Sequence, residues 1–344
     1  MKIFHLSHID LDGFGCQYLV DSLLIEEHNI EYKNTNYGQI IDSLEEWNGS
    51  ITKDSLLIIT DLNLNRKEAE YLENKRIEVG FDLQLLDHHG TGLELSKDYD
   101  WYYLDTTKCG TLLTYEWLTD SGYNVPSYQD TMLAYLTNIY DLWKLKDKDF
   151  QTSVMFEGLF SEVMRTFPLN MVDSYRDLIF NILDNASLTI YLNREVEDYS
   201  FLEDNIKTQI RSFMQEELNN YEFKPFDVIK GEFLAKKLLS NQDYIKLRFE
   251  GSLGLGVFNL SRSFQEISQY IMREENVDFV VSISDKGTIS VRGNNDTNVR
   301  IDRMCVSQFN GGGHKKAGGG IILKGFNKTI NKKEAFNALL TKLK

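Results

Sequence analysis

Three apolar runs in the first 90 residues each lead into acidic or histidine side chains. The runs lie within Ile3–Leu6, Ser55–Thr60 and Val79–Leu86, and their apolar character is typical of short buried strands. The polar side chains that follow them are, in chain order, His8, Asp10, Asp12, Asp61, Asp87, His88 and His89. Ionisable groups beside a core are costly unless something compensates them, so we expect these side chains to form a site.

The fold class follows from the alternation of strand-like and helix-like segments in residues 1–150. The strands that we predict are Lys2–Leu6, Ile30–Asn36, Ser55–Thr60 and Val79–Leu86. The predicted helices are Phe14–Glu27, Asn65–Lys75, Cys109–Thr119 and Gln129–Trp143. Short strands that alternate with helices predict an α/β domain with a doubly wound parallel sheet. Gly13 is expected to turn the chain from strand to helix, with Asp10 and Asp12 on the turn.

The remaining residues predict two further regions. Residues 151–222 have apolar residues at helical spacing and are expected to form a helical connector, which ends in a long helix near Asn193–Tyr221. Residues 223–344 are expected to form a smaller α/β domain. Its predicted strands are Lys246–Phe249, Leu255–Asn259, Phe279–Ser284 and Thr288–Arg292.

The polar strand ends predict a metal site. The carboxyl ends of strands in an open parallel sheet line one crevice, so these side chains should converge there. Asp141 closes another apolar stretch and is expected to reach the same crevice from a helix. Crowded carboxylates repel one another unless cations neutralise them. Mixed carboxylate and imidazole ligands suit Mn²⁺, with Mg²⁺ or Co²⁺ as alternatives, and there are enough ligands for two ions.

These motifs resemble the DHH phosphoesterases, a superfamily that includes RecJ nucleases, nanoRNases and bifunctional oligoribonuclease/pAp phosphatases. The resemblance rests on His8/Asp10/Asp12, Asp61, Asp87-His88-His89 and Asp141 in the family's order. The segment Gly311-Gly312-Gly313-His314 is similar to the glycine-rich mark of the accompanying DHHA1 domain. Some relatives place three residues and a proline between the first histidine and aspartate, whereas only Ile9 separates them here.

The resemblance implies a role for each residue. It assigns His8 and Asp10 to one metal and Asp12, His88 and Asp141 to the other, with Asp61 bridging the two. Two such ions are a common device for hydrolysis at phosphorus. His89 would act on the substrate phosphate or the leaving group, and Asp87 would orient a histidine.

A phosphate-binding region is predicted near the C-terminus. Residues 310–320 read as a glycine-rich loop whose N–H groups, those of Gly312 and Gly313 included, can bind an anion. Arg292 and His314 are expected to bind substrate phosphate beside it. The net charge is −15, which separates into −24 for residues 1–285 and +9 for residues 286–344. A basic, solvated surface without a ligand is the alternative interpretation.

The function that we predict is metal-dependent hydrolysis of short oligoribonucleotides to mononucleotides by a two-domain phosphodiesterase. The enzyme alternatives are hydrolysis of linear or cyclic dinucleotides, removal of phosphate from pAp, and a RecJ-like single-strand exonuclease. A non-enzyme alternative is an idle nucleotide-binding module. Such a module should have lost a metal carboxylate, and this chain retains the whole set.

Composition bears on the location and the partners. The N-terminus lacks the layout of a signal peptide, and no apolar run is long enough to span a bilayer. Cys16, Cys109 and Cys305 are too widely spaced for a disulfide framework or a zinc cluster. We therefore expect a cytoplasmic protein without membrane contact, whose partner is short single-stranded RNA or a dinucleotide. The sequence leaves both a monomer and a homodimer open.

Overall fold

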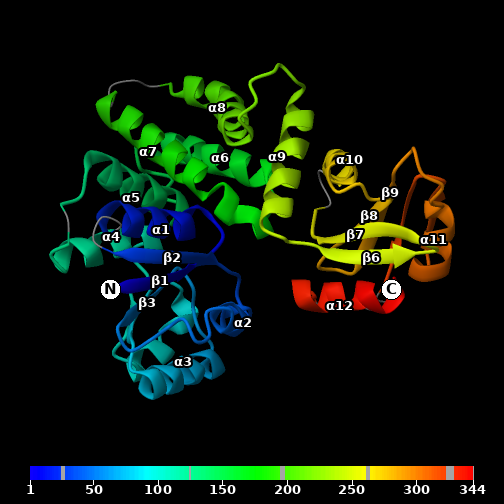
Figure 1. The fold of residues 1–344 in the computed structure, drawn as a ribbon. Helices are drawn as coiled ribbons and strands as arrows, with labels where there is room; N and C mark the ends of the chain where they lie inside the picture. The colour runs from blue at the N-terminus through cyan, green and yellow to red at the C-terminus, as the bar shows by residue number, and fades with distance from the viewer. Residues whose placement is uncertain (25–27, 124, 194–197, 261–263, 323–328, 344) are drawn as a thin grey trace. The chain divides into compact units, whose positions relative to one another are not determined.

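The chain forms two compact units, each assembled from two separate segments of the sequence (Figure 1). The computed structural model describes residues 1–344 except 25–27, 124, 194–197, 261–263, 323–328 and 344. The first unit contains Met1–Val163 and Arg176–Ile206, and the second contains Met164–Tyr175 and Lys207–Lys344. No helix in the described part of the chain is both long and apolar enough to cross a bilayer.

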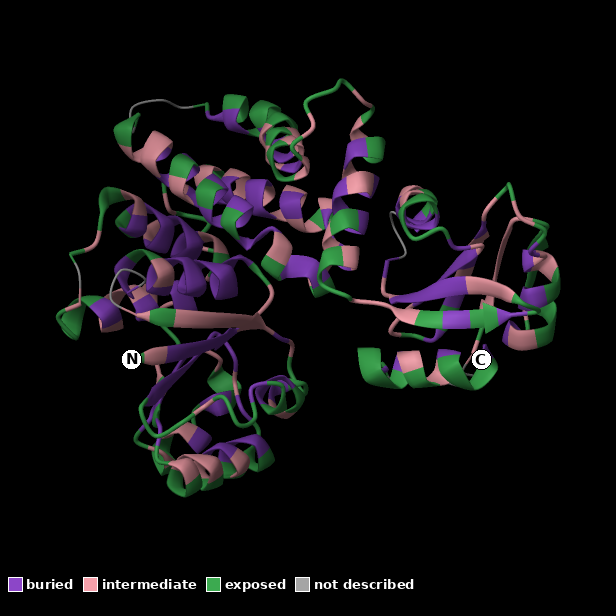
Figure 2. Cartoon of the chain, in the orientation of Figure 1, coloured by how far each residue is buried: buried purple, intermediate pink, exposed green. Residues whose placement is uncertain are grey.

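The first unit is built on a five-stranded sheet in which every neighbouring pair is parallel. Its strands are β1 (Lys2–Ser7), β2 (Asn29–Asn34), β3 (Ser55–Thr60), β4 (Asp82–Asp87) and β5 (Tyr102–Leu104), in the order β2-β1-β3-β4-β5. All six residues of β3 are buried, as expected for a central strand covered on both faces (Figure 2). This order confirms the predicted doubly wound sheet and places its switch point between β1 and β3.

Helices cover both faces of this sheet. They include α1 (Leu11–Leu24), α2 (Ile40–Glu45), α3 (Arg66–Val79), α4 (Gly110–Asp120) and α5 (Tyr128–Asp141), and the chain continues with α6 (Phe150–Thr166), α7 (Arg176–Leu192) and α8 (Ser200–Leu218). Figure 1 shows α2 and α3 on one face and α1, α4 and α5 on the other. Side chains of alternate strand residues, such as Phe4, Leu6, Leu57 and Ile59, form the core on the α2/α3 face.

Several predicted boundaries need correction. Helix α1 begins at Leu11 rather than Phe14, because the Asp10 carboxylate accepts the N–H of Gly13 and caps the first turn. Asp12 therefore lies in the helix and not on a turn. Val79 ends α3, which Gly80 closes in the left-handed conformation at φ 85°, so β4 begins only at Asp82. The sequence analysis did not foresee α2 and β5.

The second unit contains a mixed sheet with the order β10-β11-β9-β8-β7-β6. Its strands are β6 (Ile245–Phe249), β7 (Ser252–Phe258), β8 (Phe279–Ile283), β9 (Thr288–Gly293), β10 (Gly312–His314) and β11 (Ala317–Ile321). Its helices include α9 (Phe226–Ser240), α10 (Phe264–Glu274), α11 (Ile301–Phe309) and α12 (Lys332–Lys342). The four strands predicted for this region are all present. A core cluster joins strand residues such as Val281 and Val291 to Phe309 of α11 and Leu339 of α12.

The glycine-rich segment is a β-hairpin and not the loop that its sequence predicted. Strands β10 and β11 pair in antiparallel register from Gly312↔Gly319 to His314↔Ala317. A Cβ on Gly311 would lie 1.9 Å from the carbonyl oxygen of Gly319, so close backbone packing requires that glycine. Gly312 differs, because a Cβ there would meet nothing within 4 Å.

Candidate metal centre and catalytic site

The carboxyl ends of three neighbouring strands carry most of the predicted metal-binding side chains. His8 and Asp10 follow β1, Asp61 follows β3, and Asp87 ends β4 with His88 directly after it. The strands β1, β3 and β4 are adjacent in the sheet, so these side chains lie at one edge of it. This is the crevice at which open α/β sheets bind ligands.

Asp12 reaches the same place from the first turn of α1. Its carboxylate oxygens accept the backbone N–H groups of Gly110 and Thr111, both at 2.7 Å. These residues begin α4, so the carboxylate lies against the positive end of that helix. Gly110 must lack a side chain, because a Cβ would lie 2.9 Å from Cβ of Asp61 and 3.0 Å from Oδ2 of Asp12.

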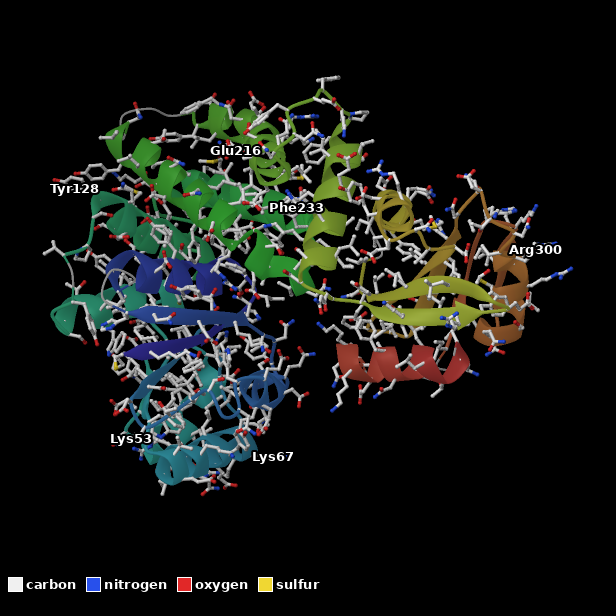
Figure 3. The ribbon with its side chains drawn as sticks, viewed as in Figure 1. Lys53, Lys67, Tyr128, Glu216, Phe233 and Arg300 are labelled. Atoms are coloured by element: carbon white, nitrogen blue, oxygen red, sulfur yellow. The ribbon has the colours of Figure 1, made fainter. Side chains whose placement is uncertain are left out.

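Asp141 is the last residue of α5, as the prediction of a helical ligand required. That helix begins at the exposed Tyr128, which Figure 3 labels, and ends beside the strand ends. Oδ2 of Asp141 lies 3.7 Å from Nδ1 of His88. The site therefore combines side chains from three strand ends and two helices.

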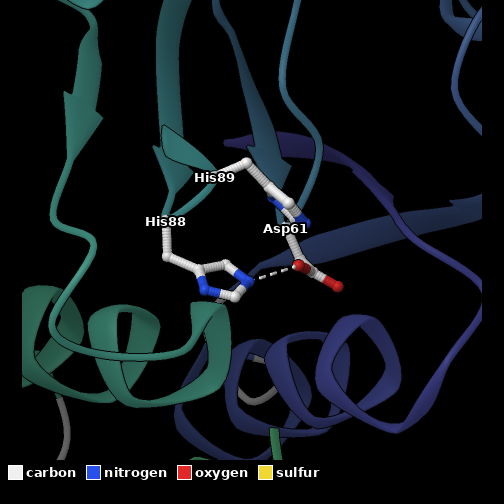
Figure 4. A group of neighbouring side chains, drawn as sticks. All are labelled: Asp61, His88 and His89. Carbon is white, nitrogen blue, oxygen red and sulfur yellow. Dashed lines mark hydrogen bonds and ion pairs between the residues drawn. The ribbon is translucent and has the colours of Figure 1, made fainter. Parts of the chain in front are cut away.

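The structure gathers these side chains into three groups whose ligand atoms lie within 4.8 Å of one another. The groups are His8, Asp10 and Asp61; Asp12, His88 and Asp141; and Asp61, His88 and His89. Figure 4 shows the third group, in which Nε2 of His88 is 3.1 Å from Oδ1 of Asp61. Among the described residues, Asp61 belongs both to the group that contains His8 and to a group that contains His88, which is the arrangement that a bridging ligand needs.

Asp61 has the features of a buried metal ligand. It is 2% exposed, and φ at this residue is 54°, in the left-handed region that non-glycine residues rarely adopt. Burial and the negative charges of Asp12 and Asp10 raise the pKa of its carboxyl group well above the ordinary value. Its Oδ2 has no hydrogen-bond partner among the described residues, and Nδ1 of His8 lies 3.6 Å away. A divalent cation would neutralise the crowded negative charges and give Oδ2 of Asp61 a partner, so these residues fit a metal.

Protons compete with a cation for the side chains of this cluster, as their pKa values show. Burial opposes protonation of His8, but hydrogen bonds and charges from Asp10 and Asp61 outweigh it and raise its pKa to about 10. Burial and the charge of Asp12 raise the pKa of Asp141 to about 7. Partial desolvation of the half-exposed Asp10 is outweighed by the hydrogen bond and charge of His8, whose Nδ1 lies 2.7 Å away, so the pKa of Asp10 is lowered. Metal binding must therefore displace protons.

His89 and Asp87 form a separate hydrogen-bonded chain beside the metal ligands. Nδ1 of His89 lies 2.7 Å from Oδ1 of the fully buried Asp87, and the hydroxyl of Tyr102 donates to Oδ2 at 2.9 Å. Because Asp87 accepts from Nδ1, Nε2 of His89 is free to accept from the hydroxyl of Tyr37, 2.9 Å away. The chain fixes the orientation of the His89 ring.

Sequence reasoning missed several residues of this site. Tyr37 and Asn34 lie at the carboxyl end of β2, so the rule that selected the other strand ends applies to them as well. Asn34 donates to the carbonyl oxygen of His8 at 2.7 Å and accepts from the buried Arg176 at 3.0 Å. The strand-end prediction included only aspartate and histidine, and the same rule applied to every polar residue would select Tyr37 and Asn34 too.

The predicted phosphate-binding residues lie together in the second unit. Ala317 of β11 pairs with His314 of β10 on one side and with Arg292 of β9 on the other. Residues in register on adjacent strands point to the same face, and Gly312 shares that face with His314. Arg292 lies over the ring of Phe264 at 5.6 Å and donates to the side chain of Gln265. We name Gly312, His314, Ala317 and Arg292 the hairpin face.

Comparison with known proteins gives three informative similarities, although no family model matches the chain. A 3′,5′-cyclic-nucleotide phosphodiesterase from Helicobacter pylori is 29% identical over an alignment of 352 positions, which covers 96% of this chain and 95% of that protein. Oligoribonuclease NrnB from Bacillus subtilis is 29% identical over 167 residues, covering 46% of this chain and 41% of that protein. The crystal structure of an uncharacterized protein from Helicobacter pylori G27 aligns with a TM-score of 0.83, at 26% identity over 99% of both chains.

Proposed function

We propose that this chain, which is a DHH phosphoesterase, hydrolyses short oligoribonucleotides to mononucleotides. The observation that carries the proposal is the position of Asp61 between two groups of potential metal ligands, with a buried oxygen that has no hydrogen-bond partner in the described part of the chain. Such a paired site suits hydrolysis at phosphorus. The similarity to an oligoribonuclease over 46% of the chain supports RNA as the substrate.

The cofactors in this proposal are two divalent cations, with Mn²⁺ the first candidate. His8 and Asp10 would hold one cation, and Asp12, His88 and Asp141 the other, with Asp61 shared. When bound, such ions supply positive charge at the phosphate and lower the pKa of the attacking water. The chain contributes the fixed positions of the ligands, which α4, α5 and three strand ends hold in place.

His89 is proposed to contact the substrate. Asp87 holds Nδ1 of His89, and Nε2 faces the partly exposed side of the site, where it meets Tyr37. A phosphate or leaving-group oxygen that took the place of the Tyr37 hydroxyl would hydrogen-bond to the same nitrogen. His89 would then stabilise the charge that develops on that oxygen. Asp87 acts only through His89, so it is a positioning residue.

The hairpin face is proposed to bind substrate phosphate. Arg292 can offer a charge-assisted hydrogen bond, and His314 is exposed at the end of β10. The open space above Gly312 leaves room for a ligand. Since positive charge is concentrated in residues 286–344 and the rest of the chain carries −24, only a few phosphates can be neutralised. A short oligonucleotide suits this charge distribution better than a long one.

Hydrolysis of 3′,5′-cyclic nucleotides is a second candidate function. The observation that favours it is the relative of that name, which matches 96% of this chain, whereas the oligoribonuclease matches less than half. The same ligand groups and the same His89 would serve either substrate, because both contain a phosphodiester.

One experiment separates these candidates. The purified protein is incubated with Mn²⁺, and in parallel with EDTA, and with labelled RNA of two to twenty nucleotides, pAp, cyclic dinucleotides and 3′,5′-cyclic AMP. We expect mononucleotide release from the shortest RNAs, loss of activity in EDTA, and recovery when Mn²⁺ is restored. Cleavage of cyclic AMP without cleavage of RNA would favour the second candidate. Metal-independent activity would contradict the proposed site.

A further inference from the structure

The chain leaves α5 through a turn that holds a tryptophan in an unusual conformation. The N–H of Lys144 donates to the carbonyl oxygen of Ile139 at 2.9 Å, and the N–H of Trp143 donates to that of Tyr140 at 3.0 Å. This pair of hydrogen bonds is a Schellman motif, which places Trp143 at the position that glycine usually occupies. Accordingly φ of Trp143 is 50°.

Neither backbone preference nor burial explains a tryptophan there. A bulky residue with positive φ is strained, because its Cβ crowds the backbone. The side chain is 56% exposed, whereas Trp47 and Trp101 are 7% and 4% exposed. The indole meets the edges of Phe150, at a centroid distance of 5.0 Å, and of Tyr140, at 5.8 Å. These contacts fix the ring but leave most of it in solvent.

Trp143 lies close to a candidate metal ligand in the chain. Trp143 follows Asp141 by two residues, so their Cα atoms lie within about 7 Å of each other. Asp141 belongs to a potential metal-binding group with Asp12 and His88. In a nucleotide the ribose separates the base from the phosphate by several bonds. A phosphate at the ligand groups would therefore bring its base within reach of a ring beside Asp141.

We propose that Trp143 is a stacking platform for a nucleobase next to the phosphate that is hydrolysed. This inference rests on the proposed function and adds to it a specificity-determining residue. A stacked base would favour nucleotides over phosphodiesters without a base, since every base has a π face. The strained turn then has a purpose, because it keeps the indole outside the core at a position two residues from Asp141.

Other exposed aromatic residues are weaker candidates. Tyr37 is 45% exposed, but its hydroxyl is engaged with His89 and it contacts the ring of His8. Tyr128 is stacked on Tyr191 at a centroid distance of 4.3 Å, and it begins the helix that Asp141 ends. Trp143 is more exposed than Tyr37, and unlike Tyr128 it lies at the end of α5 that carries Asp141.

The first test compares Trp143→Gly with Trp143→Phe and a control in the same segment, Leu145→Ala. Glycine suits the positive φ, so the W143G turn should persist. Leu145 is 63% exposed and has no proposed role. The substrates are a diribonucleotide and the same molecule with an abasic residue. We expect W143G to raise KM for the base-bearing substrate about 5- to 150-fold, the range for one lost stack, and to leave the abasic substrate unaffected. W143F should lie between W143G and the wild type, and L145A should match the wild type.

A second measurement does not depend on turnover. AMP should quench the tryptophan fluorescence of the wild-type protein, and W143G should lose that quenching. Quenching that persists in W143G, or an equal rise of KM for the base-bearing and abasic substrates, would overturn the stacking role. A wild type that binds AMP with quenching but cleaves no RNA would instead refute the oligoribonuclease proposal and leave the platform supported.

Discussion

Polar groups are mostly buried and fixed at the strand ends of the first unit, whereas they are more accessible on the hairpin face of the second. At the strand ends, Asp61 and Asp87 are buried, and Asp87 is held by two other side chains. On the hairpin face, His314 is exposed and Gly312 faces open space. Groups that take part in chemistry must be held rigidly, whereas groups that recognise a substrate must remain accessible.

This contrast predicts different consequences of mutation in the two regions. Substitutions at the strand ends should abolish metal binding and turnover, because each proposed metal ion depends on several ligands at once. Changes on the hairpin face should weaken substrate binding and leave metal in place. The predictions below test that division.

The largest effect is expected for Asp61→Asn. An amide is a poorer ligand than a carboxylate, so the variant should lose at least one metal ion and about 10³-fold or more in kcat. Metal analysis and kinetics would measure both, and circular dichroism would check the fold. Asp82→Asn is the matched control, because Asp82 is exposed at the opposite end of β4. Wild-type activity in D61N would show that Asp61 is not a required metal ligand.

Alanine at Arg292 or His314 should have the next largest effect. Loss of one hydrogen bond to a charged group costs roughly 1.5–3 kcal/mol, which corresponds to a KM about 10- to 150-fold higher. Bound metal should be unchanged. Arg248→Ala is the control, because Arg248 is exposed on β6 at the other edge of the same sheet. If R292A or H314A lost its metal and kept its KM, the division between the regions would be wrong.

A preference for short substrates should be a smaller effect. The restricted basic region predicts a higher kcat/KM for an RNA trimer than for a 24-mer, with a shallower salt dependence than proteins that contact 6–10 phosphates show. Kinetics with both substrates at several salt concentrations measure it. Equal or faster cleavage of the 24-mer would favour a RecJ-like exonuclease.

The smallest predicted effect is a pH dependence of stability. His8 binds its proton more tightly in the folded protein, with a pKa of about 10 against an ordinary 6.5. The stability that it contributes is therefore complete below pH 6.5 and is lost as pH rises towards 10. The pKa of the Asp141 carboxyl group is raised from 3.8 to about 7, so Asp141 also binds its proton more tightly in the folded protein. Its contribution to stability is lost as pH rises between these two values.

Bound metal should reverse this trend, because metal ligands must lose their protons. The difference in Tm between Mn²⁺ and EDTA should therefore widen by a few degrees from pH 5.5 to 8.5. Thermal unfolding across that range would measure it. In His8→Gln the metal-free protein should lose less Tm above pH 6.5. A difference in Tm that stays constant with pH would show that protons and metal do not compete.

The strand ends could be predicted from sequence because their signal is local. An apolar run that stops at Asp61, or at Asp87-His88-His89, shows a buried strand and a costly polar end within ten residues. A parallel sheet places the carboxyl ends of its strands at one edge, so these side chains could be predicted to converge without knowledge of distant contacts. The fold class was predictable for the same reason.

The parts that sequence did not predict depend on distant partners. The groups that bond to the Asp12 carboxylate lie 98 and 99 residues away, at the start of α4. The glycine-rich segment read as a loop, because the oxygen of Gly319 that excludes a side chain from Gly311 is known only once the hairpin forms. The position of Tyr37 after the end of β2 is a local signal, but its contact with His89, 52 residues away, is not.

The contact between Asp12 and α4 affects the choice of an inactive protein for substrate trapping. Removing the Asp12 carboxylate would leave the N–H groups of Gly110 and Thr111 without acceptors and cost about 1 kcal/mol or more in folding. Asp141 lies at the negative end of α5, where a carboxylate is unfavourable, so its removal should not weaken that helix. Asp141→Asn is therefore the better variant for capturing an uncleaved ligand from a mixture of nucleotides.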